Sequence, residues 1–332
     1  MMDYTALSRS QWLDVARRFY ARLKGELASF TASDWERVSP YLGWRNRELL
    51  AHMASAIPVN FRQVLDRALE GDPRALPEFN TFARNGREVA RRRKTPARDV
   101  LHELWSDLDK IISIYRGISD KEWLAPAWFF VGPVNVRTLF LAQFGDNVFH
   151  ARDMALVLGR WKGLDPLVTP PLIDWFIREL RPALFRPEKA RDLSATGLYR
   201  LVGTVGGDWT MHIADGRCTV ETGDHPRPDF TIRASAEDLV SAAQARAAPF
   251  VGSLARSIAW MAQPDRREDL VATITGYASA YPAILSRRIE VSGSRLLANK
   301  VNGAFWHFWQ RTKQTERNIA AGISAMGLSS AA

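Results

Sequence analysis

Residues 143–153 read Gln-Phe-Gly-Asp-Asn-Val-Phe-His-Ala-Arg-Asp. They lie within the segment 136–158, whose apolar spacing predicts a helix that ends at Gly159. On a helix, Asp146 and His150 are four positions apart and project from one face, where two side chains can share a single metal ion. An acid and a histidine at this spacing more often form a helix cap or a surface pair, so the pair alone does not establish a metal site.

A further candidate ligand is His52, which lies in the apolar stripe of a helix expected at 45–69. An imidazole buried there without a partner would cost free energy, although a hydrogen-bonded core histidine is the alternative. Two histidines and one carboxylate suit zinc, with nickel or ferrous iron as alternatives, and three protein ligands leave positions open for water, thiol or substrate. Asp153, on the same helix as His150, is expected to orient His150 or a neighbouring arginine.

The first 160 residues have the pattern of a helical bundle. Besides the segment 136–158, helices are expected at 10–29, 45–69, about 78–92 and 96–115. The second of these bends at Pro58, and Thr95 is the expected N-cap of the last. The aromatic-rich segment 123–133 is expected to be a loop. Antiparallel helices with short connections predict a four-helix-type bundle over residues 1–162, and the core of such a bundle is a usual place for metal sites.

Beyond Pro166 the pattern changes to strands. After a helical piece at about 172–185, strands are expected at about 197–205, 209–213, 218–222, 229–233 and 288–291. Asp215-Gly216 between two alternating runs predicts a hairpin turn. Strands and helices without regular alternation predict a smaller α+β domain over 163–332, so the fold class is α+β with two domains.

Two helical features are expected inside this second domain. Ser235 is the expected N-cap of a helix that leads into an aromatic-rich helical insertion at about 248–285. A C-terminal helix is expected to contain Phe305, Trp306, Phe308 and Trp309. The insertion suits packing of one domain on the other, with a lid over a substrate as the alternative.

Composition excludes several classes of protein. A chain of 332 residues exceeds what one hydrophobic core usually serves, which again favours two domains. The charge of +9 comes from arginines spread along the whole chain, so an acidic small-molecule substrate suits it better than nucleic acid. No stretch reaches the about 18 apolar residues that a membrane span needs, and the N-terminus lacks the pattern of a secretory signal. We therefore expect a cytoplasmic protein, monomeric or homodimeric.

The single cysteine, Cys218, excludes an intramolecular disulfide and a zinc site with several cysteines. It falls on the expected hairpin of the second domain, away from the three candidate ligands, which favours a structural role. Any thiol chemistry at the metal would then depend on a thiol from outside the chain.

Three segments of the first domain carry a family resemblance. Residues 42–52, Leu-Gly-Trp-Arg-Asn-Arg-Glu-Leu-Leu-Ala-His, resemble the motif that opens the second helix of the DinB-like bundle family. Residues 127–133, Ala-Trp-Phe-Phe-Val-Gly-Pro, and residues 143–153 resemble later motifs of its mycothiol-dependent maleylpyruvate isomerase branch. The resemblance implies that His52, Asp146 and His150 bind the metal. The chain departs from the branch in having aspartate where the isomerase has glutamate, which puts metal identity and reach in doubt.

The second domain is similar to sterol-carrier-protein domains. Residues 228–239 resemble the central strand-to-helix passage of those domains, and residues 289–293 with Leu296-Leu297 resemble their closing strand and helix. The order of the two resemblances agrees with the two-domain isomerase architecture.

The isomerase resemblance implies an enzyme in which the metal helps mycothiol, or a similar low-molecular-weight thiol, to act as a thiolate. Such a thiolate adds to an activated substrate, giving cis-trans isomerisation or thiol transfer. Arg84, Arg137 and Arg152 are candidates for holding an acidic substrate or an anionic thiol cofactor, with solvated helix faces as the alternative. The alternative function is a carrier of a lipid or other hydrophobic ligand, in which the metal site is structural or vestigial.

Overall fold

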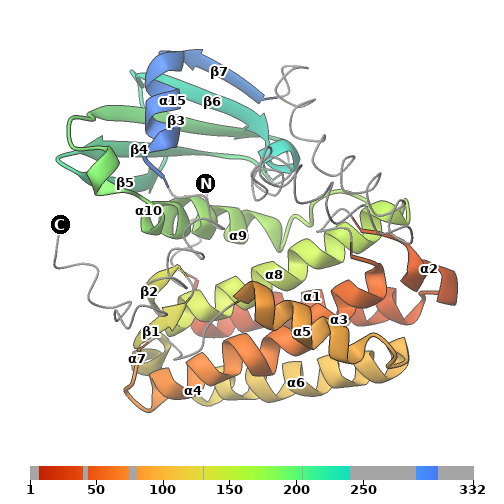
Figure 1. The fold of residues 1–332 in the computed structure, drawn as a ribbon. Coiled ribbons are helices and arrows are strands. Elements are labelled where there is room, and N and C mark those ends of the chain that lie inside the picture. The colour runs from red at the N-terminus through yellow and green to blue at the C-terminus, as the bar shows by residue number, and fades with distance from the viewer. Residues whose placement is uncertain are drawn as a thin grey trace.

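The computed structural model describes residues 7–39, 44–74, 81–129, 131–203, 205–239 and 289–305. Figure 1 shows a helical N-terminal domain below and a C-terminal β-sheet above it, with one helical segment between the two. This is the two-domain α+β architecture that the sequence predicts. The aromatic-rich insertion at 248–285, together with Trp306, Phe308 and Trp309, lies outside the described residues.

The N-terminal domain is built around helices α1 (Arg9–Ala28), α3 (Asn46–Ala56), α6 (Ala97–Gly117) and α8 (Val136–Val157). The start of α1 is fixed by a capping box, in which Ser8 and Gln11 each accept a hydrogen bond from the backbone N–H of the other. Asn135 caps α8 by accepting from the backbone N–H of Thr138 at 2.8 Å. The apolar faces of the four helices share one core, which includes Trp12, Leu23, Leu49, Leu50, Leu104, Phe140 and Phe144.

The second expected helix, for which the sequence predicts a bend at Pro58, continues through the proline by a change of helix type. A π-helical turn, η2 (Ile57–Arg62), contains the proline and leads directly into α4 (Gln63–Leu69). Such turns accommodate a residue that cannot donate a backbone hydrogen bond. The side chain of Asn60 on η2 donates to Asn85 at 3.0 Å, which holds α5 (Thr81–Arg92) beside it.

Three local expectations are wrong. Part of the segment 123–133 forms a hairpin of β1 (Pro126–Phe129) and β2 (Gly132–Asn135), preceded by α7 (Asp120–Trp123). Strands of four residues are too short for alternation to show in the sequence. Helix α6 has Pro96, not Thr95, at its N-cap position, with extended backbone and no side-chain cap. The C-terminal helix α15 (Arg295–Gly303) ends before Phe305.

Within the described residues, the second domain has a mixed sheet of order β5-β4-β3-β6-β7. Its strands are β3 (Ala195–Val202), β4 (Gly207–Ala214), β5 (Arg217–Thr222), β6 (Phe230–Ser235) and β7 (Ile289–Gly293). Strands β3 and β6 are parallel, and the other neighbours are antiparallel. Asp215 and Gly216 have φ of 50° and 68°, as the expected two-residue hairpin between β4 and β5 requires.

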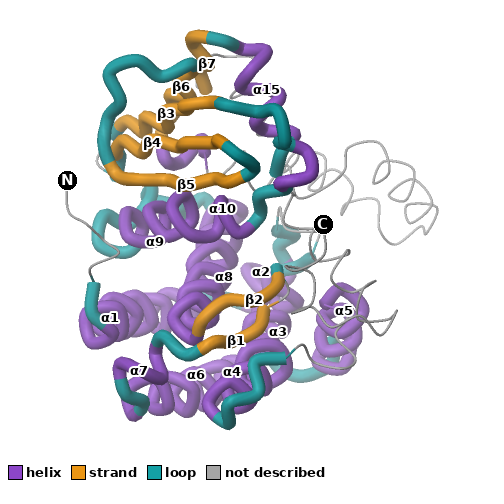
Figure 2. Tube along the Cα trace, turned by 90° about the vertical axis from the view of Figure 1, so that its left-hand side faces the viewer, coloured by secondary structure: helices purple, strands orange, loops and turns teal. Residues whose placement is uncertain are grey.

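A helical segment lies between the sheet and the bundle (Figures 1 and 2). It consists of α9 (Thr169–Trp175), the π-helical turn η3 (Phe176–Leu180) and α10 (Arg181–Ala183). Asp174 on α9 is buried and accepts hydrogen bonds at 2.8 Å from Trp209 on β4 and from Arg178. Arg137 on α8 pairs with Glu179 on η3. The segment is therefore tied to both domains. None of the helices in the described part of the chain is long and apolar enough to cross a membrane.

Candidate metal centre

Helices α3 and α8 bring together the three side chains that the sequence singles out. The carboxylate of Asp146 lies between the two histidines, with Oδ1 3.2 Å from Nε2 of His150 and Oδ2 3.7 Å from Nε2 of His52. The two imidazole rings are 5.0 Å apart, centroid to centroid, at an interplanar angle of 80°. One donor atom from each residue lies within 4.8 Å of the others, the only such cluster of three found in the described part of the chain.

The surroundings make this cluster buried on one side and open on the other. His52 and His150 are 4% and 3% exposed, whereas the side chain of Asp146 is 31% exposed. The indole ring of Trp44 lies 5.4 Å from the ring of His52. The two imidazoles are thus held in the protein interior, and Asp146 is the most exposed of the three side chains.

The three side chains of the cluster change one another's pKa values. Burial lowers the pKa of His52 to about 4, against the attraction of Asp146. Burial also acts to lower the pKa of His150, but the carboxylates of Asp146 and Asp153 outweigh it and raise the value to about 9. Burial acts to raise the pKa of Asp146, and the neighbouring His150 and His52 nevertheless hold it below its usual range. A carboxylate and a neutral His52 are therefore available as ligands at neutral pH.

The donor set fits a divalent metal ion. Donor atoms about 2.0–2.2 Å from a tetrahedral zinc are about 3.3 Å from each other, close to the two distances that Asp146 makes to the histidines. With three protein ligands, such an ion keeps a position open, and the exposed edge of Asp146 leaves room for a small molecule to reach it.

The outer nitrogen of His150 faces a chain of charged side chains. Its Nδ1 atom lies 3.8 Å from Oδ2 of Asp153, and Oδ1 of Asp153 lies 3.6 Å from Nη1 of Arg152. Arg152 in turn donates from Nε and Nη2 to Oε1 of Glu237, at 3.0 and 2.8 Å. Glu237 follows β6, so the chain of contacts runs from the metal cluster into the second domain.

Of the three arginines proposed for an anionic cofactor, only Arg152 lies next to the cluster. Arg84 on α5 donates to Gln63 at 3.1 Å, and Arg137 pairs with Glu179. Since the guanidinium groups of Arg137 and Arg152 contact carboxylates, an anion would have to displace or share these partners. The role of the three arginines stays a prediction.

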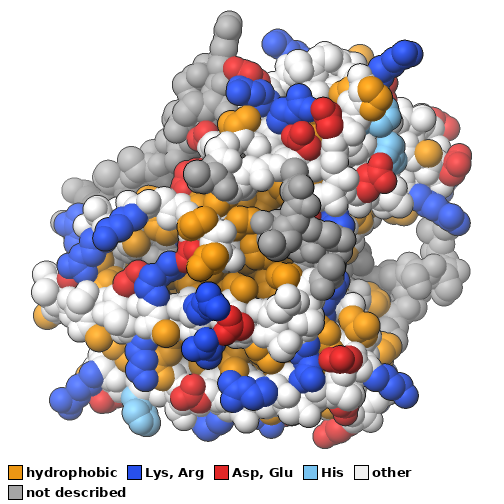
Figure 3. Space-filling model, turned by 180° about the vertical axis from the view of Figure 1, so that it is seen from behind, with side chains coloured by type: hydrophobic (Ala, Val, Ile, Leu, Met, Phe, Trp, Pro, Cys, Tyr) orange, Lys and Arg blue, Asp and Glu red, His pale blue; other side chains and the backbone are white. Residues whose placement is uncertain are grey.

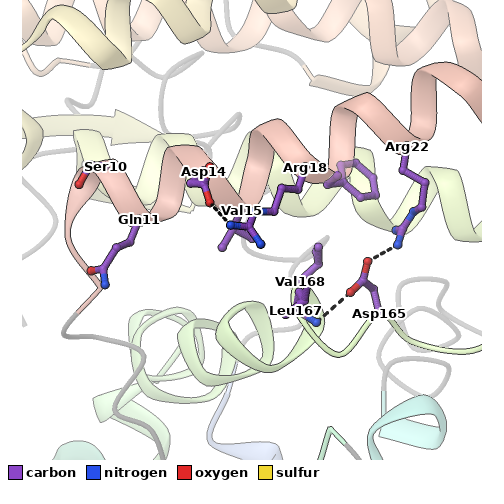
Figure 4. Close-up of a pocket in the computed structure, with 10 residues that line it drawn as sticks. Ser10, Gln11, Asp14, Val15, Arg18, Arg22, Asp165, Leu167 and Val168 are labelled. Carbon is purple, nitrogen blue, oxygen red and sulfur yellow. Dashed lines mark hydrogen bonds and ion pairs between the residues drawn. The ribbon is translucent and has the colours of Figure 1, made fainter.

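A separate groove lies between α1 and the segment before α9. It has a volume of about 550 Å³. Figure 4 shows Arg22 of α1 pairing with Asp165 across it. Its lining residues are Ser10, Gln11, Asp14, Val15, Arg18, Phe19, Arg22, Asp165, Leu167 and Val168. None of the three candidate ligands lines the groove.

Figure 3, seen from behind, shows hydrophobic side chains gathered in a hollow between the two domains.

Cys218 lies on β5, in the sheet and not in the metal cluster. Burial raises the pKa of its thiol to about 12, against a small opposing effect of Arg181. The thiol is therefore protonated and a poor nucleophile at neutral pH.

Sequence reasoning did not assign roles to Glu237, Trp161 and Trp44. Glu237 accepts from Trp161 Nε1 at 3.4 Å as well as from Arg152. The residue lies within a segment, 228–239, that carries the resemblance of the second domain. Its contact with Arg152 joins residues 85 positions apart, so no local spacing could have indicated it.

Comparisons with known proteins agree with this architecture. Residues 16–155 match the model of the mycothiol maleylpyruvate isomerase N-terminal domain, and residues 183–255 match that of the SCP-2 sterol transfer family. The resemblances drawn from the sequence motifs are thereby confirmed. A search of curated proteins finds no significant match.

Two solved structures are similar over most of both chains. A mycothiol-dependent maleylpyruvate isomerase aligns with a TM-score of 0.50 and 13% identity, over 72% of this chain and 90% of that one. A histidine-to-alanine mutant of a mycothiol-dependent maleylpyruvate isomerase aligns with a TM-score of 0.50 and 12% identity, over 74% of this chain and 92% of that one. At such identities the likeness concerns the fold.

Proposed function

We propose that this chain is a metal- and thiol-dependent enzyme, because residues 16–155 match the mycothiol maleylpyruvate isomerase N-terminal domain and residues 183–255 match the SCP-2 family. Its reaction is an isomerisation or a thiol transfer that begins with attack of a thiolate on an activated substrate. The observation that supports the proposal is the convergence of His52, Asp146 and His150 in one cluster, in which Asp146 is partly exposed.

His52, Asp146 and His150 are the proposed metal ligands of this centre. His52 and His150 present Nε2 atoms, and Asp146 presents a carboxylate, to a divalent ion for which zinc is the first choice and nickel or ferrous iron the alternatives. The bound ion supplies positive charge that lowers the pKa of mycothiol or a similar thiol, so that the thiolate forms near neutral pH. The buried imidazoles exclude water from one side of the cluster and direct small molecules to the Asp146 side.

Metal analysis followed by a thiol-dependence assay tests the proposal. We expect one equivalent of zinc, nickel or iron in the purified protein, and conversion of maleylpyruvate or a related cis-unsaturated acid only when mycothiol is added. Chelation should abolish turnover and the metal should restore it. A metal-free protein, or turnover that does not change when mycothiol is withheld, would refute the proposal.

The domain boundary belongs to the proposal as well. We infer a bundle over 1–162 and a second domain over 163–332, and the two family matches fall on either side of that boundary. A small-molecule substrate is compatible with the bundle and with the second domain. The expected cytoplasmic location and the monomeric or homodimeric state stay predictions.

A second candidate function rests on the SCP-2 match. A carrier would bind a lipid-like ligand through the second domain, with a metal that is structural or vestigial. Displacement of a fluorescent fatty acid, measured with and without metal, distinguishes the two functions. The carrier would be favoured if the protein binds the fatty acid equally tightly with and without metal and shows no turnover.

A further inference from the structure

An interdomain contact lies at the back of the metal cluster. Arg152 on α8 is 6% exposed, and its guanidinium donates twice to Oε1 of Glu237. It also lies 5.8 Å from the ring centroid of Trp161, whose Nε1 donates to the other carboxylate oxygen of Glu237 at 3.4 Å. Two donors and an aromatic face therefore hold the arginine and the glutamate in one geometry.

Glu237 lies in the first turn of a helix that begins directly after β6, and the start of this helix is well fixed. Ser235, the last residue of β6, accepts from the backbone N–H of Asp238 at 3.0 Å and lies 2.8 Å from a carboxylate oxygen of the same residue. Ala236 is buried. Glu237 thus lies just beyond the end of a central strand of the second domain, and its position depends on how that domain docks onto α8.

The same arginine reaches toward the metal cluster. Its Nη1 atom is 3.6 Å from Oδ1 of Asp153, whose side chain is only 3% exposed, and Oδ2 of Asp153 is 3.8 Å from Nδ1 of His150. His150 points its other nitrogen, Nε2, at Asp146. The orientation of a metal-binding imidazole is set by the partner of its outer nitrogen, and that partner is in turn set by its own contacts.

We propose that Arg152 and Glu237 are positioning residues, through which docking of the second domain orients Asp153 and, through it, the metal ligand His150. The inference rests on the proposed metal centre. A bundle without the second domain in place would keep its three ligands but would lack the contact that holds Asp153 in line with His150. The second domain then stabilises the geometry of the metal centre, in addition to binding any ligand of its own.

The test is a comparison of zinc affinity and Co²⁺ spectra among full-length variants. Glu237→Gln keeps the shape of the side chain and removes its charge. Glu179→Gln is the matched control. It removes the ion pair between Glu179 on η3 and Arg137, which lies on the same helix α8 as Arg152. We expect Glu237→Gln to weaken zinc binding by about tenfold and to shift the visible absorption bands of the Co²⁺ protein. Glu179→Gln should leave both at wild-type values.

A double-mutant cycle checks that the effect passes through Asp153. In an Asp153→Asn background, Glu237→Gln should weaken zinc binding by less than about twofold further, since the contact it supports is already lost. Should Glu237→Gln fold poorly, Arg152→Lys replaces it, because lysine keeps the charge and lacks the fork that reaches two carboxylates.

The outcomes separate this inference from the proposed function. Wild-type zinc affinity and Co²⁺ spectrum in both Glu237→Gln and Arg152→Lys, or full additivity with Asp153→Asn, would show that the contact is only a clamp between the domains. That result leaves the proposed enzyme intact. Wild-type protein that binds no zinc would instead overturn the metal centre itself, and this inference with it.

Discussion

The carboxylate of Asp146 on α8 lies 3.7 Å from Nε2 of His52 on α3, although the two residues are on helices far apart in the chain. This contact turns a local pair, Asp146 and His150, into a cluster of three donors. The geometry suits a divalent ion with an open position.

Removal of a single ligand should abolish tight metal binding. We expect His52→Ala and Asp146→Ala each to weaken zinc binding by more than about 100-fold. Changing a residue that only supports a metal ligand costs up to about 100-fold, and loss of the ligand itself should cost more. Equilibrium dialysis with elemental analysis measures it. His102→Ala, which truncates an exposed histidine on α6, is the control and should bind like wild type. One equivalent of tightly held zinc in Asp146→Ala would argue against the centre.

Zinc affinity should rise with pH up to about pH 9. At pH 7 the metal-free protein carries a proton on His150, whose pKa is raised to about 9, and none on His52, whose pKa is lowered to about 4. The metal must therefore displace one histidine proton, which gives up to about tenfold in affinity per pH unit below pH 9. Calorimetry in two buffers of different ionisation enthalpy counts the protons released. An affinity that is flat from pH 7 to 9 would contradict the assignment.

The raised pKa of His150 should make the metal-free protein less stable as the pH rises, whereas zinc affinity increases over the same range. Because the pKa of His150 is above its ordinary 6.5 in the fold, its contribution is complete below pH 6.5 and is lost as the pH rises through about 9. The zinc-loaded protein, in which His150 is already deprotonated, should not show that loss. Thermal unfolding of both forms across this range makes the comparison.

The single cysteine should be dispensable for thiol chemistry. Burial raises the pKa of Cys218 to about 12, so it is a thiol at pH 7, and it lies on β5 away from the three metal ligands. Cys218→Ser is expected to keep full metal content and full mycothiol-dependent turnover. Alkylation of the native protein by iodoacetamide at pH 7 should be slow beside that of the unfolded chain. Loss of turnover in a folded, metal-loaded Cys218→Ser would place the nucleophile in the chain.

Two glycine-to-alanine changes should have opposite effects on stability. A Cβ on Gly197 in β3 would lie 2.4 Å from the ring of Phe230, so Gly197→Ala should destabilise the second domain by about 1–3 kcal/mol. Gly25 is exposed on α1 with nothing within 4 Å of an added Cβ, so Gly25→Ala should stabilise that helix by about 1 kcal/mol. Urea unfolding measures both. Equal stability of the two variants would show that β3 relaxes around the added methyl group.

Much of the fold can be read from periodicity. The stripes at 10–29 and 136–158 predict α1 and α8 nearly to the residue, and the Asp215-Gly216 turn predicts the hairpin of β4 and β5. The hairpin of β1 and β2 escapes prediction because each strand is only four residues long. The parallel pairing of β3 with β6 also lies beyond periodicity, since strand order depends on contacts between distant segments.

The sequence by itself determined the two domain types, the ligand chemistry and the shared face of Asp146 and His150, because helix geometry relates residues four apart wherever a helix forms. The family resemblance added His52 to that pair, and the expected hairpin put Cys218 elsewhere. Only the tertiary structure decided the distance at which His52 meets Asp146 and that Glu237 reaches Arg152. The reason is physical. Contacts between distant residues depend on how buried side chains pack and how the domains dock, and no local repeat encodes either.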